Sequence, residues 1–238
     1  PYRSLWSNSD FAKHVLGDVV KPGSNVISIL PMAHMYGMAF EFLYEFLSGV
    51  HIYYLTRIPS PAIISQALQE VKPIIMIAVP LVIEKIICKK VFPKIQNNRM
   101  RILLNMPVIN KKVREKIREQ VYQAFGGNLY EIIIGGAALN GEIESFLRHI
   151  DFPYTVGYGA TECAPIICYR DWHTFVKGSC GQAALHQEVR IDSSDPQNIP
   201  GEILTKGPNV LLGYYKNEEA TQQAIDKDGW FHTGDLGL

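Results

Sequence analysis

The feature that most constrains the fold is a series of short apolar segments, rich in Ile, Val and Ala, that alternate with longer segments of helical periodicity. We predict strands at residues 25–30, 51–55, 73–79, 129–134 and 152–156. Strands without a regular polar alternation are buried on both faces, which is typical of a parallel sheet covered by helices. The sequence therefore predicts an α/β fold built on a mostly parallel sheet.

The intervening segments carry apolar residues at helical spacing. Helices are predicted at residues 2–16, 60–71, 81–125 and 141–149, the third with interruptions around Pro93 and Pro107. The strongly apolar segment 37–47 fits either a core helix, which is the commoner case, or the wall of a hydrophobic substrate pocket.

The C-terminal part changes character, because helical periodicity fades between residues 172 and 181 and turn-forming residues separate short strands. Strands are expected at 188–191, 201–205 and 210–215, with one helix at 217–225. We therefore expect two subdomains: residues 1–172 form the α/β part, and residues 173–238 form a small β-barrel-like or sandwich-like part.

The residues Gly-Tyr-Gly-Ala-Thr-Glu at 157–162 follow a predicted strand and combine several ligand-binding groups. Gly157 and Gly159 permit positive φ or a close approach of the backbone to a ligand, and Tyr158 offers a flat surface to a base. Thr161 can hydrogen-bond an anionic oxygen, and Glu162 can hold Mg²⁺, which prefers one or two carboxylates together with phosphate oxygens. The turn suits a nucleotide phosphate with its magnesium, but a tight turn with a capping Thr explains so short a motif equally well.

Three further motifs are candidates for the same site. Gly135, Gly136 and Ala137 stand at a strand-to-helix turn, where glycine also serves without any ligand. His34 follows the first predicted strand, and open α/β sheets bind ligands at the C-terminal ends of their strands. Asp235, in Thr-Gly-Asp, can accept hydrogen bonds from two vicinal hydroxyls such as those of a ribose, although such tripeptides are also common in surface turns.

Charge and cysteine content narrow the class of protein. Lys plus Arg and Asp plus Glu each number 23, and no long basic run occurs, so nucleic acid is a poor candidate partner. The four cysteines lack zinc-ligand spacing, and we expect reduced thiols in a cytoplasmic protein. The apolar run at 74–83 is too short to span a bilayer, which leaves peripheral membrane association open.

Six motifs occur in order along the chain. They are Leu-Pro-Met-Ala-His-Met-Tyr-Gly at 30–37, Gly-Gly-Ala at 135–137, Gly-Tyr-Gly-Ala-Thr-Glu at 157–162, Gly-Glu-Ile at 201–203, Gly-Pro to Gly-Tyr-Tyr at 207–215 and Gly-Trp-Phe-His-Thr-Gly-Asp at 229–235. Together they resemble the adenylate-forming acyl-CoA synthetase family over nearly the whole chain. The long segment 81–125 is most similar to the long-chain fatty acid CoA ligase branch.

The resemblance implies a role for each candidate residue. Nucleotide binding would fall to Gly135, Gly136, Ala137, Gly157, Tyr158, Gly159, Thr161 and Asp235. Among these, Tyr158 would stack on adenine, Thr161 would contact the α-phosphate, and Asp235 would bind the ribose hydroxyls. Glu162 would ligate Mg²⁺, and His34 would lie near the acyl-adenylate and the thiol channel. Catalysis is expected to depend on Thr161, Glu162 and His34.

The implied reaction has two steps, with ATP, Mg²⁺ and coenzyme A as cofactors. A carboxylate attacks the α-phosphate of ATP to give acyl-AMP and pyrophosphate, and the thiol of coenzyme A then displaces AMP. Neither step needs a protein nucleophile, so the protein would act through positioning and electrostatic stabilisation. Residues 35–40, after His34, contain no carboxylate that could pair with a substrate ammonium, which favours a fatty acid over an amino acid.

Two parts of the family pattern are not found in this sequence. The phosphate-binding loop of the family would precede Tyr2, and its C-terminal lid would follow Leu238, so we expect a central piece of a ligase that is inactive by itself. Two alternatives stay open: an enzyme that passes another carboxylic acid to a carrier-protein thiol, and a non-catalytic nucleotide-binding module. The sequence does not determine the acyl chain length or the oligomeric state.

Overall fold

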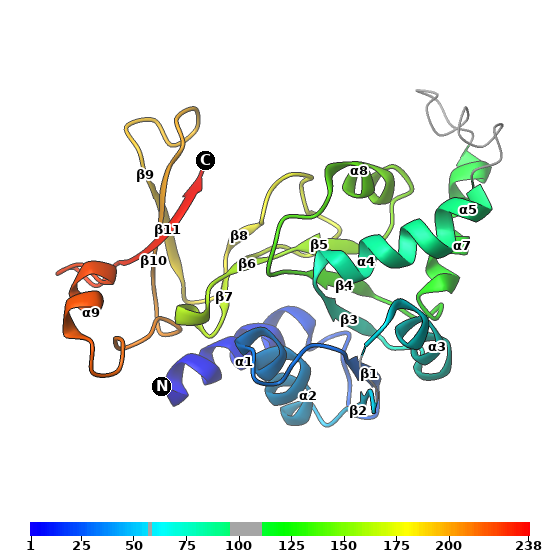
Figure 1. Cartoon of the computed structure of the whole chain (residues 1–238), viewed down its shortest axis with the longest axis horizontal. Coiled ribbons are helices and arrows are strands. Elements are labelled where there is room, and N and C mark those ends of the chain that lie inside the picture. The colour runs from blue at the N-terminus through cyan, green and yellow to red at the C-terminus, as the bar shows by residue number, and fades with distance from the viewer. Residues whose placement is uncertain (57–58, 96–110) are drawn as a thin grey trace.

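The computed structural model describes residues 1–56, 59–95 and 111–238. The predicted interruption at Pro107 lies outside these residues. Parallel strands and most of the helices occupy one end of the molecule, and an antiparallel sheet with helix α9 (Glu218–Ala224) occupies the other (Figure 1). Among the described residues, no helix is both long enough and apolar enough to cross a membrane.

The central strands are parallel, as the sequence predicts. They are β1 (Asn25–Ser28), β2 (His51–Tyr54), β3 (Ile75–Ala78), β4 (Glu131–Ile134) and β5 (Tyr154–Val156). β1 pairs with β2, and β4 lies between β3 and β5. A hydrogen bond from Ile74 N to Asn25 O (2.9 Å) joins the two sheets. The predicted α/β fold is therefore confirmed, with its parallel strands divided between two sheets.

The helices around these strands differ in how they begin, and only some of them start at a capping side chain. They are α1 (Tyr2–Leu16), the π-helical η1 (Gly37–Leu43) that continues into α2 (Tyr44–Leu47), α3 (Pro61–Val71), α4 (Pro80–Ile86), the π-helical η2 (Ile87–Val91), α5 (Phe92–Ile95), α7 (Lys111–Ala124) and α8 (Gly141–His149). Ser60 Oγ accepts a hydrogen bond from Ile63 N at the start of α3 (3.3 Å), and Asn140 Oδ1 accepts one from Glu142 N at the start of α8 (2.9 Å). These caps satisfy backbone donors that have no partner within the helix.

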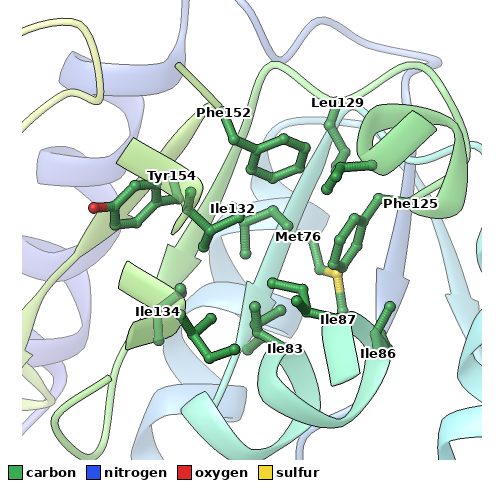
Figure 2. Packing of buried hydrophobic residues seen from close by; sticks show 14 of the residues in the cluster. Met76, Ile83, Ile86, Ile87, Phe125, Leu129, Ile132, Ile134, Phe152 and Tyr154 are labelled. Carbon is green, nitrogen blue, oxygen red and sulfur yellow. The ribbon is translucent and has the colours of Figure 1, made fainter. Parts of the chain in front are cut away.

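Two hydrophobic clusters lie on opposite faces of the parallel strands. Met76 of β3 and Ile132 of β4 pack with residues of α3, α4, α7 and α8, and Figure 2 shows part of this cluster. Ile75 and Ile77 of β3 belong to the second cluster, with residues of α1, η1 and α2. Successive strand residues point to opposite faces, and helices cover both faces of β3 and β4. This explains why these strands are mostly apolar without a regular polar alternation.

The remaining strands form two antiparallel sheets. The first contains β6 (Tyr158–Gly159), β7 (Ile166–Tyr169) and β8 (Gln182–Ala183) in that order. The second contains β9 (Glu188–Asp192), β10 (Gly201–Lys206) and β11 (Phe231–Gly237), with β10 in the centre. In the part of the chain that the structure describes, β9 and β11 do not pair with each other, so this sheet is open. The expected β-barrel-like closure is therefore wrong. β9 alternates exposed and half-buried residues, the pattern of a sheet with one face in solvent.

The strand predicted at 210–215 is also wrong. Its backbone groups bond elsewhere: Leu211 N donates to Glu162 O (2.7 Å), and Tyr214 N donates to Thr221 Oγ1 (2.8 Å). Only an isolated bridge between Tyr214 and Asn217 has strand character. The segment is therefore an irregular connection between β10 and α9, despite its strand-like composition.

Candidate active site

A cavity of about 310 Å³ lies where the chain leaves β4 and β5. Most of the predicted site residues line it, namely His34, Gly135, Gly136, Gly157, Tyr158, Gly159, Thr161 and Glu162. Ala137, one residue beyond Gly136 (φ +86°), is exposed and is not part of the lining. The C-terminal ends of parallel strands are where open α/β sheets bind ligands, so the cavity is the candidate active site.

The turn at 157–162 is shaped by its own backbone contacts. Gly157 N donates a hydrogen bond to Ile134 O (2.9 Å), which extends the pairing of β4 with β5 by one residue. A Cβ atom on Gly159 would lie 2.2 Å from Pro165 O, closer than any real contact allows. Neither glycine has a positive φ. Glycine at 159 is therefore required by the close approach of β7, and the left-handed conformation that the sequence also allowed is not used.

The hydroxyl of Tyr158 connects the turn to the C-terminal sheet. It donates a hydrogen bond to Asp235 Oδ2 (2.6 Å), although the two residues are 77 positions apart in the sequence. Burial and this carboxylate raise the pKa of Tyr158 above its usual range, so the phenol stays a donor. Thr233 Oγ1 accepts a hydrogen bond from Asp235 N (3.1 Å) and donates one to Ile203 O (2.7 Å). Asp235 does not line the cavity itself, but it lies beside a residue that does.

Glu162 is held by the irregular segment after β10. The Tyr214 hydroxyl donates to Glu162 Oε1 (2.9 Å). No group in the described ranges donates a hydrogen bond to the other oxygen, Oε2. These ranges contain no cluster of three or more His, Cys, Asp or Glu side chains that could hold a metal by themselves. One free carboxylate oxygen beside a cavity fits Mg²⁺, because this ion takes few protein ligands and completes its shell with phosphate oxygens and water.

His34 lines the cavity from the loop between β1 and η1. Its Nδ1 accepts a hydrogen bond from Tyr36 N (3.2 Å), so the other ring nitrogen carries the proton in the neutral imidazole. The Tyr36 hydroxyl donates to Ile133 O (3.1 Å), and a Cβ atom on Gly135 would lie 3.0 Å from the Tyr36 ring. Gly135 therefore lets Tyr36 pack against β4 and fix the loop that carries His34.

The apolar wall of the cavity was only partly predictable. It is formed mainly by Phe11, Ala12, Val15, Leu16, Tyr36, Phe40, Tyr44, Ile77, Ile133, Pro165, Ile166 and Tyr169. The first four of these residues lie in the predicted first helix, at helical spacing, but periodicity cannot tell a face that lines a cavity from one that fills a core. Phe40 and Tyr44 of the segment 37–47 are buried and also line the cavity, so this segment is both part of the core and part of the cavity wall. That the cavity holds the substrate stays a prediction.

Comparisons with known proteins agree with this geometry. A sequence profile of the AMP-binding enzyme family matches residues 2–215. Long-chain-fatty-acid-CoA ligase 1 of Saccharomyces cerevisiae is 32% identical over 89% of this chain and 33% of its own length. Long chain acyl-CoA synthetase 1 of Arabidopsis thaliana is 32% identical over 89% of this chain and 35% of its own length.

A solved structure shows the same fold. o-Succinylbenzoate CoA synthetase of Bacillus subtilis, in complex with its acyl-adenylate intermediate, superposes with a TM-score of 0.76 at 19% identity and covers 99% of this chain and 42% of its own. This chain belongs to the family of AMP-binding, adenylate-forming enzymes. It spans about a third of the length of the two curated relatives.

Proposed function

We propose that this chain is part of an ATP-dependent acid-CoA ligase, which activates a long-chain fatty acid as acyl-AMP and then transfers the acyl group to coenzyme A. The observation that carries the proposal is a single cavity that joins the 157–162 turn to an apolar wall on α1 and η1. An acyl-adenylate needs a site of this kind, with polar groups for the nucleotide at one end and hydrophobic surface for the tail at the other.

The polar end of the cavity would bind the nucleotide. The Tyr158 ring would stack on adenine, the Thr161 hydroxyl would donate to the α-phosphate, and Asp235 would accept hydrogen bonds from the ribose. Glu162 would hold Mg²⁺, which when bound neutralises phosphate charge. These groups would stabilise charge that develops on the phosphate oxygens and would orient the acid for attack, so no protein nucleophile is required.

The apolar end would bind the acid. Its wall contains the buried side chains of Phe11, Ala12 and Phe40, none of which can pair with a charged substrate tail. A hydrocarbon tail gains free energy from leaving water there, whereas an unpaired ammonium group would lose it. The two curated relatives named above are a long-chain fatty acid CoA ligase and a long chain acyl-CoA synthetase, which supports the same substrate class.

Binding of hydrolysis-resistant acyl-adenylate analogues tests the proposal without requiring turnover. We expect calorimetric affinity to rise from AMP through the octanoyl to the hexadecanoyl sulfamate of adenosine, by up to about fourfold per buried methylene. Ala12→Leu adds a larger side chain to the apolar wall and so narrows the cavity. It should weaken binding of the hexadecanoyl analogue and leave AMP binding unchanged. Ala62→Leu, on an exposed part of α3 that does not line the cavity, is the matched control.

Two results would contradict this proposal. Equal affinity for AMP and every acyl analogue would show that the apolar wall does not receive the tail. Tighter binding of a glycyl analogue than of the hexadecanoyl analogue would favour an amino acid as the substrate.

A further inference from the structure

The carboxylate of Glu162 is oriented by a residue far along the chain. Tyr214 lies 52 residues away in sequence and donates its hydroxyl hydrogen to Glu162 Oε1 (2.9 Å). Three residues earlier in the same segment, Leu211 N donates to the main-chain oxygen of Glu162 (2.7 Å). One segment therefore holds both the side chain and the backbone of Glu162.

Tyr214 is itself fixed by the first turn of α9. Its backbone N–H donates to Thr221 Oγ1 (2.8 Å), and the Thr221 hydroxyl donates to Asn217 O (2.8 Å). A Cβ atom on Gly213 would lie 2.7 Å from Thr221 Cγ2, so this helix packs closely on the residue before Tyr214. Tyr214 thus connects α9 to the Glu162 carboxylate, through its backbone N–H at one end and its hydroxyl at the other.

The geometry points to a function for this contact that fold stability alone does not explain. A hydroxyl that donates to one carboxylate oxygen fixes the rotation of the whole group, and here it leaves Oε2 as the oxygen without a donor among the described residues. Removal of a residue that holds a metal ligand in this way typically lowers metal affinity by about 10–100-fold.

We propose that Tyr214 is a positioning residue, which holds the Glu162 carboxylate in the orientation that binds the nucleotide-associated metal ion. This inference rests on the proposed function, because that function assigns Glu162 to the metal. Tyr214 touches neither the substrate nor the metal in this scheme and acts only through Glu162.

The test compares ATP affinity with and without Mg²⁺, measured by calorimetry on the purified protein. The ratio of the two affinities reports the contribution of the metal separately from that of the nucleotide. We expect Tyr214→Phe to lower this ratio about 10-fold or more and to leave the affinity for metal-free ATP unchanged. Tyr215→Phe is the matched control, because it removes the hydroxyl of the next residue, which is 89% exposed, and should not change the ratio.

A second variant separates failure of this inference from failure of the proposed function. Glu162→Gln should lower the ratio at least as much as Tyr214→Phe, and the double variant should show no further loss. If Glu162→Gln lowers the ratio and Tyr214→Phe does not, Tyr214 is not a positioning residue although the metal assignment holds. An unchanged ratio in Glu162→Gln would overturn the metal assignment and this inference with it. If Tyr214→Phe weakens ATP binding by the same factor with and without Mg²⁺, the role of Tyr214 is purely structural and the inference is wrong.

Discussion

The two glycines in the 157–162 turn differ in how much space a side chain would have. A Cβ atom at 159 would lie 2.2 Å from Pro165 O, whereas at 157 the nearest heavy atom, Cys168 O, would be at an ordinary 3.4 Å. The Pro165 carbonyl cannot move away freely, because it accepts a hydrogen bond from Ala160 N (2.9 Å). Residue 157 can therefore carry a larger side chain, whereas residue 159 cannot.

We expect Gly159→Ala to lower the free energy of unfolding by about 2 kcal/mol or more, because the added methyl group forces the turn away from β7. Gly157→Ala should cost less than about 1 kcal/mol, since its methyl group finds ordinary contact distances. Urea denaturation of both variants measures the difference. Equal losses would mean that the steric conflict at residue 159 relaxes at little cost.

Most of the candidate residues predicted from the sequence line one cavity, but their contacts could not be predicted. The glycine-rich turns after two predicted strands end at the cavity because parallel strands deliver their C-terminal ends to one edge. The contact of Tyr214 with Glu162 was not predicted, because residues 210–215 have the composition of a strand. The contact also joins two segments that are far apart in the sequence and share no local pattern. Asp235 was selected by its motif, yet its hydrogen bond to Tyr158 depends on how β11 pairs with β10.

Helices and strands that depend on interactions between residues close in sequence were predicted better than those that depend on distant pairing. Helix α1 matches its predicted bounds, and α3 begins one residue after its predicted start at residue 60, because helical spacing and capping involve residues a few positions apart. The prediction of a β-barrel-like closure is wrong because closure depends on pairing between strands that are distant in the sequence. The division into subdomains at residues 172 and 173 stays a prediction.

The η1–α2 helical segment carries two buried carboxyl groups that the site does not use directly. Glu41 accepts hydrogen bonds from Ser28 Oγ (3.1 Å) and Leu30 N (2.8 Å), which ties the end of β1 to η1 just before the loop that carries His34. Glu45 is 1% exposed, and its Oε2 has no hydrogen-bond partner among the described residues. Burial, with a smaller contribution from Glu41, raises the pKa of Glu45 from 4.5 to about 9.

This raised pKa predicts a pH-dependent stability. Between pH 4.5 and about 9, the folded state holds a proton on Glu45 that the unfolded state has released, so stability falls as pH rises through this window. Glu45→Gln removes the ionisation, and we expect the variant to gain about 2 kcal/mol or more relative to wild type between pH 5 and pH 8. Urea denaturation at several pH values measures the gain. Glu70→Gln, at an exposed position of α3, should show no such trend.

Across the whole molecule, the first helix links segments that are far apart in the sequence. Asn8 is fully buried, and its side chain donates to Cys163 O (3.0 Å) and accepts from Ile166 N (2.9 Å). One turn earlier, Ser4 Oγ donates to Pro208 O (3.2 Å). Helix α1 therefore braces the backbone that follows the 157–162 turn and also contacts the segment that carries Tyr214.

Removal of the Asn8 side chain should weaken both the fold and the site. Asn8→Ala leaves the Cys163 carbonyl and the Ile166 N–H buried without partners, and each such group costs about 1–3 kcal/mol, so we expect a loss of about 2–4 kcal/mol in urea denaturation. AMP affinity should fall as well, because the adjacent turn carries Tyr158 and Thr161. Ser7→Ala is the control, since Ser7 Oγ is buried with no hydrogen-bond partner in the described chain and its removal should cost less than about 0.5 kcal/mol. Equal losses in the two variants would show that α1 contributes only packing. A larger loss in Asn8→Ala, together with weaker AMP binding, would show that the 157–162 turn depends on a side chain about 150 residues earlier in the chain.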